Sequence, residues 1–103
     1  MQVDIEAARL LTYQAAMAVD STPLLERENI MELTSYAKYF GARVATDVAL
    51  QSLILHGGMG FMKESRITAI WEDAPVLHIY EGTDPIQLYV IARQFFKKQN
   101  VKV

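Results

Sequence analysis

The stretch from Asn29 to Gly60, which reads NIMELTSYAKYFGARVATDVALQSLILHGGMG, decides the fold of this chain. Its apolar residues recur at intervals of three and four, which is typical of one face of a long helix. Asn29 can cap the N-terminus of that helix, and Glu32 stands at the reciprocal position of a capping box. The glycine run Gly57-Gly58-Met59-Gly60 is predicted to end it, because glycine readily adopts left-handed C-terminal conformations. The predicted apolar face consists of Ile30, Leu33, Ala37, Phe40, Val44, Val48 and Leu55.

Helical patterns also lie on both sides of this long helix. The first predicted helix covers Val3 to Val19 and ends at Asp20-Ser21-Thr22-Pro23. A short helix around Glu64 to Glu72 is expected before Pro75, which limits its continuation. Its inward side is predicted to carry Ile67, Ile70 and Trp71.

The last predicted helix runs from about Asp84 to Lys98. Pro85 suits its first turn, and Lys97 and Lys98 suit the negative end of its dipole. The chain shows no convincing pair of strands. The expected fold is therefore all-α, an antiparallel up-and-down helical bundle that forms a single domain over residues 1–103.

Composition narrows the functional classes. The chain has 103 residues, 51% of them hydrophobic and 21% charged, as expected of a globular domain. Its net charge of −2 and lack of basic blocks do not support nucleic-acid binding. The sequence contains no cysteine, which excludes disulfides and thiol catalysis. It has no apolar run of membrane-spanning length and no signal-like start, so a cytoplasmic location is expected.

The best candidate for chemistry lies in the segment Ile79 to Gln87, which reads IYEGTDPIQ. Glu81 stands between two apolar segments, directly before a glycine and a predicted helix start. Gly82 permits a positive φ angle or a close backbone approach, and Thr83 can cap the following helix. A carboxylate beside free backbone N–H groups could act as a base. The alternative is a solvated acid in an ordinary interhelical turn.

Four motifs together resemble a known family. They occur in the order and approximate spacing of the C-terminal helical domain of the acyl-CoA dehydrogenases. The resemblance covers almost the whole chain. Complete members of that family also have an N-terminal helical domain and a middle β domain, so this chain is expected to be a partial C-terminal domain that lacks at least one earlier helix. The motifs are Ala37-Lys38-Tyr39-Phe40, Gly57-Gly58-Met59-Gly60-Phe61, Asp73-Ala74 and Ile79-Tyr80-Glu81-Gly82-Thr83.

The resemblance implies a role in fatty acid metabolism and assigns roles to individual residues. Glu81 corresponds to the base that removes a proton α to an acyl-CoA thioester, while the β hydrogen leaves as hydride to FAD. The backbone of Glu81 and Gly82 would bind the thioester part of the substrate. Gly57, Gly58 and Thr83 match positions that contact the FAD cofactor, sometimes across a subunit interface.

A second interpretation stays open, namely an inactive helical module for assembly or interaction. It is favoured by Ile54, where the family commonly has glutamine, by Glu72, where a basic residue is aligned, and by Asp84-Pro85 after Thr83. In either case an exposed apolar face is expected to seek a partner, as a homo-oligomer or with a complementary dehydrogenase subunit. His56 and His78 lack companion ligands, so no metal site is predicted.

Overall fold

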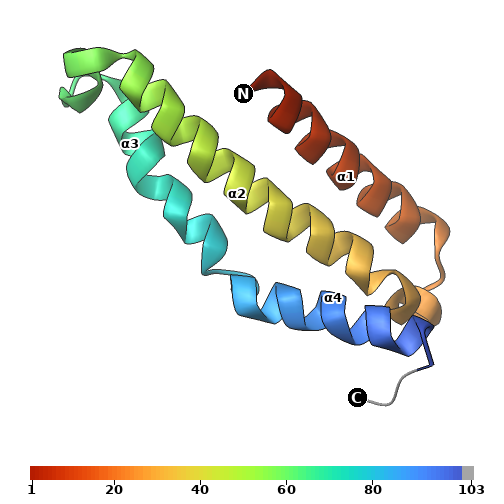
Figure 1. Cartoon of the computed structure of the whole chain (residues 1–103). Helices are drawn as coiled ribbons and strands as arrows, with labels where there is room; N and C mark the ends of the chain where they lie inside the picture. The colour runs from red at the N-terminus through yellow and green to blue at the C-terminus, as the bar shows by residue number, and fades with distance from the viewer. Residues whose placement is uncertain (101–103) are drawn as a thin grey trace.

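The computed structural model describes residues 1–100 and is helical nearly throughout (Figure 1). No strand occurs in this range, which confirms the all-α prediction. The four α-helices are α1 (Gln2–Ser21), α2 (Met31–Leu55), α3 (Arg66–Asp73) and α4 (Asp84–Lys98). Three short 3₁₀ segments connect them: η1 (Leu24–Ile30), η2 (Gly57–Phe61) and η3 (Ala74–His78).

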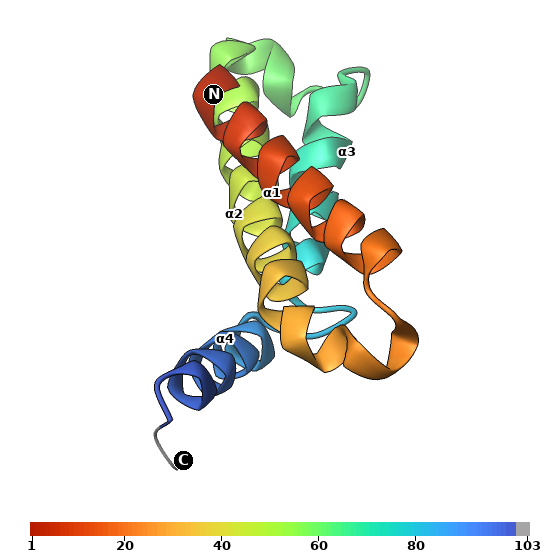
Figure 2. The same ribbon diagram turned by 90° about the vertical axis from the view of Figure 1, so that its right-hand side faces the viewer.

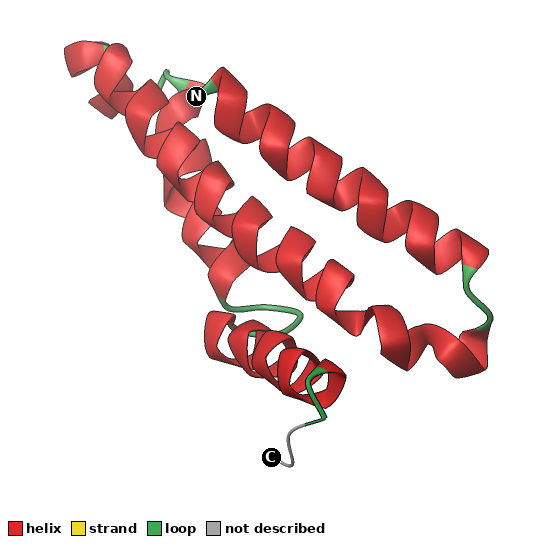
Figure 3. Cartoon of the chain, turned by 45° about the vertical axis from the view of Figure 1, so that its right-hand side comes forward, coloured by secondary structure: helices red, strands yellow, loops and turns green. Residues whose placement is uncertain are grey.

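Helix α2 is the central element of the bundle. Helix α1 packs along it in the opposite direction, and α3 and α4 follow one another back along it (Figures 1 and 2). The antiparallel up-and-down arrangement is therefore confirmed. A loop over residues 79–83 joins η3 to α4 (Figure 3), and Glu81 in this loop lines a cleft together with Gly41 from the middle of α2.

Most of the predicted helix ends are correct. Helix α4 has the expected bounds, with Pro85 in its first turn. Helix α1 ends at Ser21, inside the predicted stop signal. Helix α2 ends just before Gly57, whose φ angle of +59° is the left-handed conformation expected of a helix-ending glycine.

The predicted capping box at the start of α2 is wrong. Segment η1 continues to Ile30, so Asn29 lies within a 3₁₀ turn and makes no cap. A capping residue needs an extended backbone before the helix, and the chain enters α2 already coiled. Glu32 is instead buried and accepts a hydrogen bond from Lys98 at the end of α4. This ion pair fastens the C-terminal end of α4 to the beginning of α2.

The predicted apolar faces of α2 and α3 are only partly correct. Leu55 is 74% exposed, and on α3 Ile70 and Trp71 are also exposed, although Ile67 is half-buried. Because α1, α3, η3 and α4 all touch α2, its buried surface is not a single stripe. The buried apolar residues are mainly small: Ala15, Ala42, Val44, Ala49, Leu53 and Ala74. Within residues 1–100, no helix is both long and apolar enough to cross a membrane.

Candidate active site

The turn between η3 and α4 has an unusual backbone. Glu81 has a φ angle of +53° and Gly82 one of +99°, so two consecutive residues adopt positive φ angles. For a residue with a side chain this costs about 1–2 kcal/mol. Such strain persists only where the surrounding structure fixes it, and it is concentrated at functional sites. The side chain of Glu81 is thereby presented at the surface, immediately before the N-terminus of α4.

Gln87 supports this turn from within α4. Its side chain is 9% exposed, and its amide nitrogen lies 3.5 Å from the carbonyl oxygen of Glu81 and 3.4 Å from that of Gly82. Contacts of this length are weak hydrogen bonds. A Cβ atom on residue 82 would overlap the same amide nitrogen. The φ angle therefore favours glycine at position 82, and a larger residue there would also have to displace the Gln87 amide.

Helix α2 supports the turn from the other side through Lys38. Its ammonium group donates a hydrogen bond to the carbonyl oxygen of Leu77 and lies 5.7 Å from the centre of the Tyr80 ring. A cation at that distance from an aromatic face is attracted to it. Lys38 thus connects the middle of α2 to Leu77 and Tyr80, which lie just before Glu81 in the chain.

A cleft of ≈ 300 Å³ opens between α2 and this turn. Glu81 and Tyr80 line one side, and Gly41 of α2 lines the other. A Cβ atom on Gly41 would meet no atom within 4 Å, so glycine leaves this wall open. The cleft is mainly apolar, and its complete lining is Lys38, Gly41, Ala42, Leu77, Tyr80 and Glu81. This arrangement can bring a carboxylate against an apolar group, as a base that acts on carbon requires.

His78 links the turn to both neighbouring helices. Its Nε2 atom lies 2.7 Å from the Thr46 hydroxyl of α2, and its Nδ1 atom lies 2.7 Å from a carboxylate oxygen of Asp84 in α4. The sequence had indicated only that His78 lacks companion metal ligands. His56, by contrast, is exposed at the end of α2, where its Nδ1 atom lies 2.7 Å from the Ser52 carbonyl oxygen. Among residues 1–100 no cluster of metal-binding side chains occurs.

The predicted cofactor residues do not all gather beside Glu81. Gly57 and Gly58 lie beyond the far end of α2, sixteen positions or more from Gly41 in the cleft wall. At 1.5 Å per residue this separation is about 24 Å. Both glycines are exposed, with no atom within 4 Å of a Cβ position, so their backbone is open to an outside group.

Thr83 is the third predicted cofactor residue, and it directly follows the base. It occupies the N-cap position of α4, as expected, but its side chain makes no capping hydrogen bond. The capping bond itself was therefore wrongly predicted. A hydroxyl that is not used for capping can serve a ligand beside the turn.

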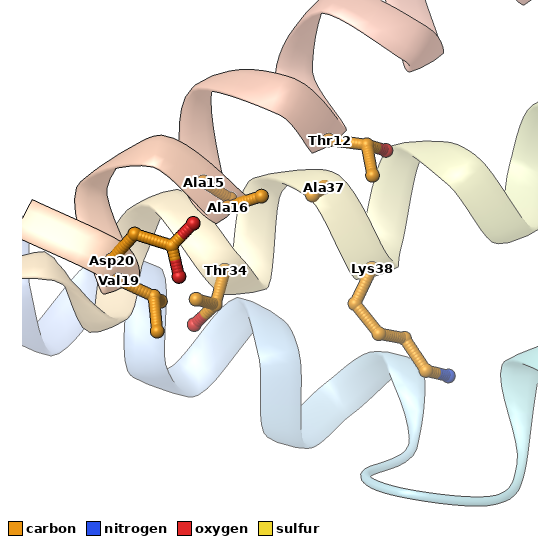
Figure 4. Close-up of a pocket in the computed structure, with 8 residues that line it drawn as sticks. All are labelled: Thr12, Ala15, Ala16, Val19, Asp20, Thr34, Ala37 and Lys38. Carbon is orange, nitrogen blue, oxygen red and sulfur yellow. The ribbon is translucent and has the colours of Figure 1, made fainter.

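A second hollow lies between α1 and α2, away from Glu81 (Figure 4). It measures ≈ 490 Å³ and shares Lys38 with the cleft. Its walls are small, largely apolar side chains from both helices: Thr12, Ala15, Ala16, Val19, Thr34 and Ala37, with Asp20 at one end. Its two titratable groups, Asp20 and Lys38, lie at opposite ends, whereas the cleft has Glu81 on a mainly apolar wall, so the candidate active site is the cleft beside Glu81.

The supporting residues were missed in the sequence for different reasons. The sequence signal for Gln87 is its spacing from Gln94: the two glutamines lie seven positions apart, which places them on one face of α4, and the structure shows that this face is buried. Lys38 and His78 gave no comparable signal. Their partners on the other elements lie 39 and 32 positions away in the sequence.

Comparison with known proteins is consistent with this geometry. Residues 1–96 match the family described as "Acyl-CoA dehydrogenase, C-terminal domain". The 3-(aryl)acrylate reductase of Clostridium sporogenes is 37% identical over 97 residues, which cover 94% of this chain and 24% of the reductase. The CarC subunit of the caffeyl-CoA reductase–Etf complex of Acetobacterium woodii is 33% identical over 98 residues, or 95% of this chain and 24% of the subunit.

A mitochondrial relative shows the same pattern. The short-chain specific acyl-CoA dehydrogenase of Bos taurus is 37% identical over 97 residues, which are 94% of this chain and 22% of the bovine protein. The chain thus spans about a quarter of the length of the curated relatives it matches.

Proposed function

Since the chain belongs to the acyl-CoA dehydrogenase family through its C-terminal domain, we propose that it supplies the catalytic base Glu81 for α,β-dehydrogenation of an acyl-CoA thioester. The observation that carries this proposal is the position of Glu81, at a strained φ of +53° on the wall of a mainly apolar cleft. A solvated acid in an ordinary turn would need neither the strain nor the supports from α2 and α4.

The chemistry assigned to the chain is the movement of one proton. The carboxylate of Glu81 takes the proton from the α carbon, and the backbone N–H of Glu81 donates a hydrogen bond to the thioester oxygen as enolate charge develops there. Tyr80 and the apolar wall of the cleft exclude water from the acyl group. When bound, FAD supplies the redox chemistry by accepting the β hydrogen as hydride.

The residues proposed to hold FAD are Gly57, Gly58 and Thr83. The open backbone at the two glycines and the uncommitted hydroxyl of Thr83 suit contacts with a polar cofactor. Because about 24 Å separates the glycines from the cleft, we propose that the two groups contact different parts of the flavin or flavins of different subunits. Ile54 contributes no amide near the glycines, so the backbone is the expected contact there.

The relatives include reductases as well as a dehydrogenase, so the direction of the reaction is a separate question. In the reductive direction the protonated Glu81 would return its proton to the α carbon of an α,β-unsaturated thioester. The same residue serves both directions by microscopic reversibility. Assays should therefore start from both saturated and unsaturated acyl-CoA thioesters.

Flavin binding is tested by the visible absorption spectrum of the purified chain after FAD has been added and unbound cofactor removed. Stoichiometric flavin would support a cofactor site built by this chain, as an oligomer. A colourless protein would mean that another subunit is required. In that case the same measurement is repeated on the complex of the chain with a complementary dehydrogenase subunit.

The base is tested in the flavin-loaded assembly by replacing Glu81 with glutamine, which keeps the shape and removes the basic oxygen. Anaerobic bleaching of flavin absorbance by acyl-CoA should slow by about 10²- to 10⁴-fold, the contribution typical of a positioned base. The matched control is Glu72→Gln on α3, an exposed acid outside the cleft. Equal flavin content shows that the cofactor site is intact, and an unchanged rate for Glu81→Gln would overturn the assignment.

A second candidate function, a module for assembly, is favoured by the open shape of the chain. Its radius of gyration is 16.8 Å, whereas a compact domain of this length has about 13 Å. Its accessible surface is 7512 Å², against about 5,900 Å² for a folded protein of this mass. The excess of about 1,600 Å² on this one chain is about twice the roughly 800 Å² that each partner buries in an ordinary protein–protein interface.

We propose that this surface pairs with a second copy or with a complementary dehydrogenase subunit. Exposed apolar side chains on α1 and α4 supply the contact, among them Leu10, Tyr13 and Met17 of α1. Sedimentation equilibrium at micromolar concentration should show a species heavier than 11.7 kDa, whereas a strict monomer in the presence of the candidate subunit would contradict the proposal.

Location in the cytoplasm remains a prediction, which cell fractionation can check.

A further inference from the structure

His78 occupies a position that no family motif assigned. It precedes Glu81 by three residues, and Asp84 follows Glu81 by three. The imidazole ring of His78 contacts Thr46 of α2 through Nε2 and Asp84 of α4 through Nδ1, each at 2.7 Å. These three residues, here called the histidine clasp, join α2 to both ends of the turn that carries the base.

The hydrogen-bonding capacities of the clasp residues are complementary. An ionised Asp84 only accepts, so Nδ1–H must be the donor toward it. In the neutral ring Nε2 then accepts from the Thr46 hydroxyl, whose hydrogen is in that case no longer donated to the Ala42 carbonyl oxygen. In the charged ring Nε2–H donates to the Thr46 oxygen, whose own hydrogen is directed to the Ala42 carbonyl oxygen 2.8 Å away. Both forms of His78 therefore complete the clasp.

Asp84 is suited to its part in the clasp. It lies in the first turn of α4, where the helix dipole favours a negative charge. One of its oxygens is bound by His78, while the other, Oδ1, is buried and has no hydrogen-bond partner among residues 1–100. The bond from His78 is thus the contact that fixes this carboxylate. Loss of it would leave the Asp84 carboxylate without a side-chain partner among residues 1–100.

The clasp contacts are shorter than those that Gln87 makes with the same turn. The contacts of Gln87 with the turn are 3.4 and 3.5 Å long, against 2.7 Å for each contact of His78. Short charge-assisted bonds are roughly twice as strong as neutral ones. A left-handed Glu81 needs such an external constraint, because its backbone conformation is unfavourable by itself.

We propose that His78 is a positioning residue, which acts through the clasp to hold the Glu81 turn at a fixed place against the α2 wall of the cleft. This inference rests on the proposed function of Glu81 as the base. It gives a role to Asp84, which differs from the usual family residue and could otherwise indicate lost function. His78 itself touches neither the cleft nor the reacting atoms.

The geometry is tested first in the unmodified chain, so that no variant needs to fold. Nitrogen-15 spectra of the imidazole rings, recorded where histidine is neutral, should show His78 as the Nδ1–H tautomer. The two histidine signals are assigned with the variant His56→Gln, because Nδ1 of His56 also faces an acceptor, the Ser52 carbonyl oxygen. The Nε2–H tautomer at His78 would overturn the proposal, because Asp84 could not then accept from Nδ1.

Amide hydrogen exchange then tests whether the clasp constrains the turn. The reporters are the amides of Tyr80, bonded to Val76, and Gln87, bonded to Thr83. Removing the Thr46 contact by Thr46→Val should lower their protection about two- to tenfold. The same change should have no further effect in His78→Asn, whose amide nitrogen replaces Nδ1 but cannot reach Thr46. If Thr46→Val lowers amide protection equally in the wild-type chain and in His78→Asn, then Thr46 and His78 are not coupled and the proposed clasp fails.

The catalytic consequence is read in the flavin-loaded assembly. His78→Gln keeps a donor toward Thr46 but loses the bond to Asp84, and it should lower kcat about tenfold with little change in KM, because the base is misplaced while substrate binding is retained. His56→Gln should leave kcat unchanged. An unchanged kcat in His78→Gln, with Glu81→Gln inactive, would overturn the positioning role alone. If Glu81→Gln is fully active, the proposed function fails, and the tautomer and exchange results still decide whether the clasp exists.

Discussion

Two of the turns that contain left-handed residues, the one after α2 and the one before α4, are built in opposite ways. The turn after α2 begins at Gly57 and exposes its backbone, with open space around Gly57 and Gly58. The turn before α4 has a left-handed Glu81 and is supported by Lys38 and Gln87. The first turn offers peptide groups to an outside partner. The second presents one carboxylate on a backbone that the chain itself fixes.

The glycine turn is nevertheless anchored at its far end. Gly60 is buried against the last turn of α2, and the Thr68 hydroxyl of α3 donates a hydrogen bond to its carbonyl oxygen. The glycine turn is thus fixed at Gly60, while Gly57 and Gly58 stay open to a ligand. The Glu81 turn needs several ties, because a residue with a side chain does not adopt a positive φ angle unaided.

The largest effect on stability is expected from breaking the anchor of the glycine turn with Gly60→Ala. The new Cβ atom would lie 2.7 Å from the Leu53 carbonyl oxygen and 3.0 Å from its side chain. Because the backbone must shift, the free energy of unfolding should fall by about 3 kcal/mol. Urea denaturation followed by circular dichroism measures this loss. Gly58→Ala in the same turn is the control and should change it little, since nothing lies near that Cβ position.

A somewhat smaller loss is expected from Gly82→Ala in the other turn. The φ angle of +99° strains any residue with a side chain, and the methyl group would displace the Gln87 amide. Together these effects should lower the free energy of unfolding by about 2 kcal/mol. Turnover in the flavin-loaded assembly should fall as well, because Glu81 moves with residue 82. Normal turnover with normal stability would show that the turn tolerates rearrangement.

Removing the lysine support should have a still smaller effect. Lys38→Met keeps the apolar stem and removes the ammonium group that binds the Leu77 carbonyl oxygen and faces the Tyr80 ring. We expect a loss of about 1–2 kcal/mol in the same denaturation measurement. Lys63→Met, an exposed lysine beside the glycine turn, is the matched control and should be nearly neutral. If Lys38→Met and Lys63→Met lower the free energy of unfolding equally, then Lys38 gives the Glu81 turn no special support.

The smallest change should be a gain in stability. Gly41 lies within α2 and a Cβ atom there meets no neighbour, so Gly41→Ala should raise the free energy of unfolding by about 0.5–1 kcal/mol. The methyl group would also narrow the cleft opposite Glu81. Thermal denaturation tests the gain, and KM for acyl-CoA thioesters of different size tests the narrowing. If Gly41→Ala instead lowers the free energy of unfolding, the space beside residue 41 is already occupied by other atoms.

Local chemistry was predicted well where a few neighbouring residues determine it. The bounds of α4 and the left-handed Gly57 follow from proline and glycine preferences that act over a single turn. The same reasoning failed at Asn29, where the preceding 3₁₀ segment removed the extended residue that a cap requires. The burial of Gln87 and Gln94 on the inward face of α4 was also not predicted.

The sequence by itself determined the helices, their approximate ends, the family, and Glu81 as the residue to test. These depend on periodicity, on turn chemistry and on motifs whose members are close together. Only the tertiary structure decided that Lys38, Thr46 and His78 meet around the Glu81 turn, and that Gly57 and Gly58 lie far from it. The physical reason is distance along the chain: contacts between residues more than 30 positions apart depend on how the helices pack, and no local preference encodes them.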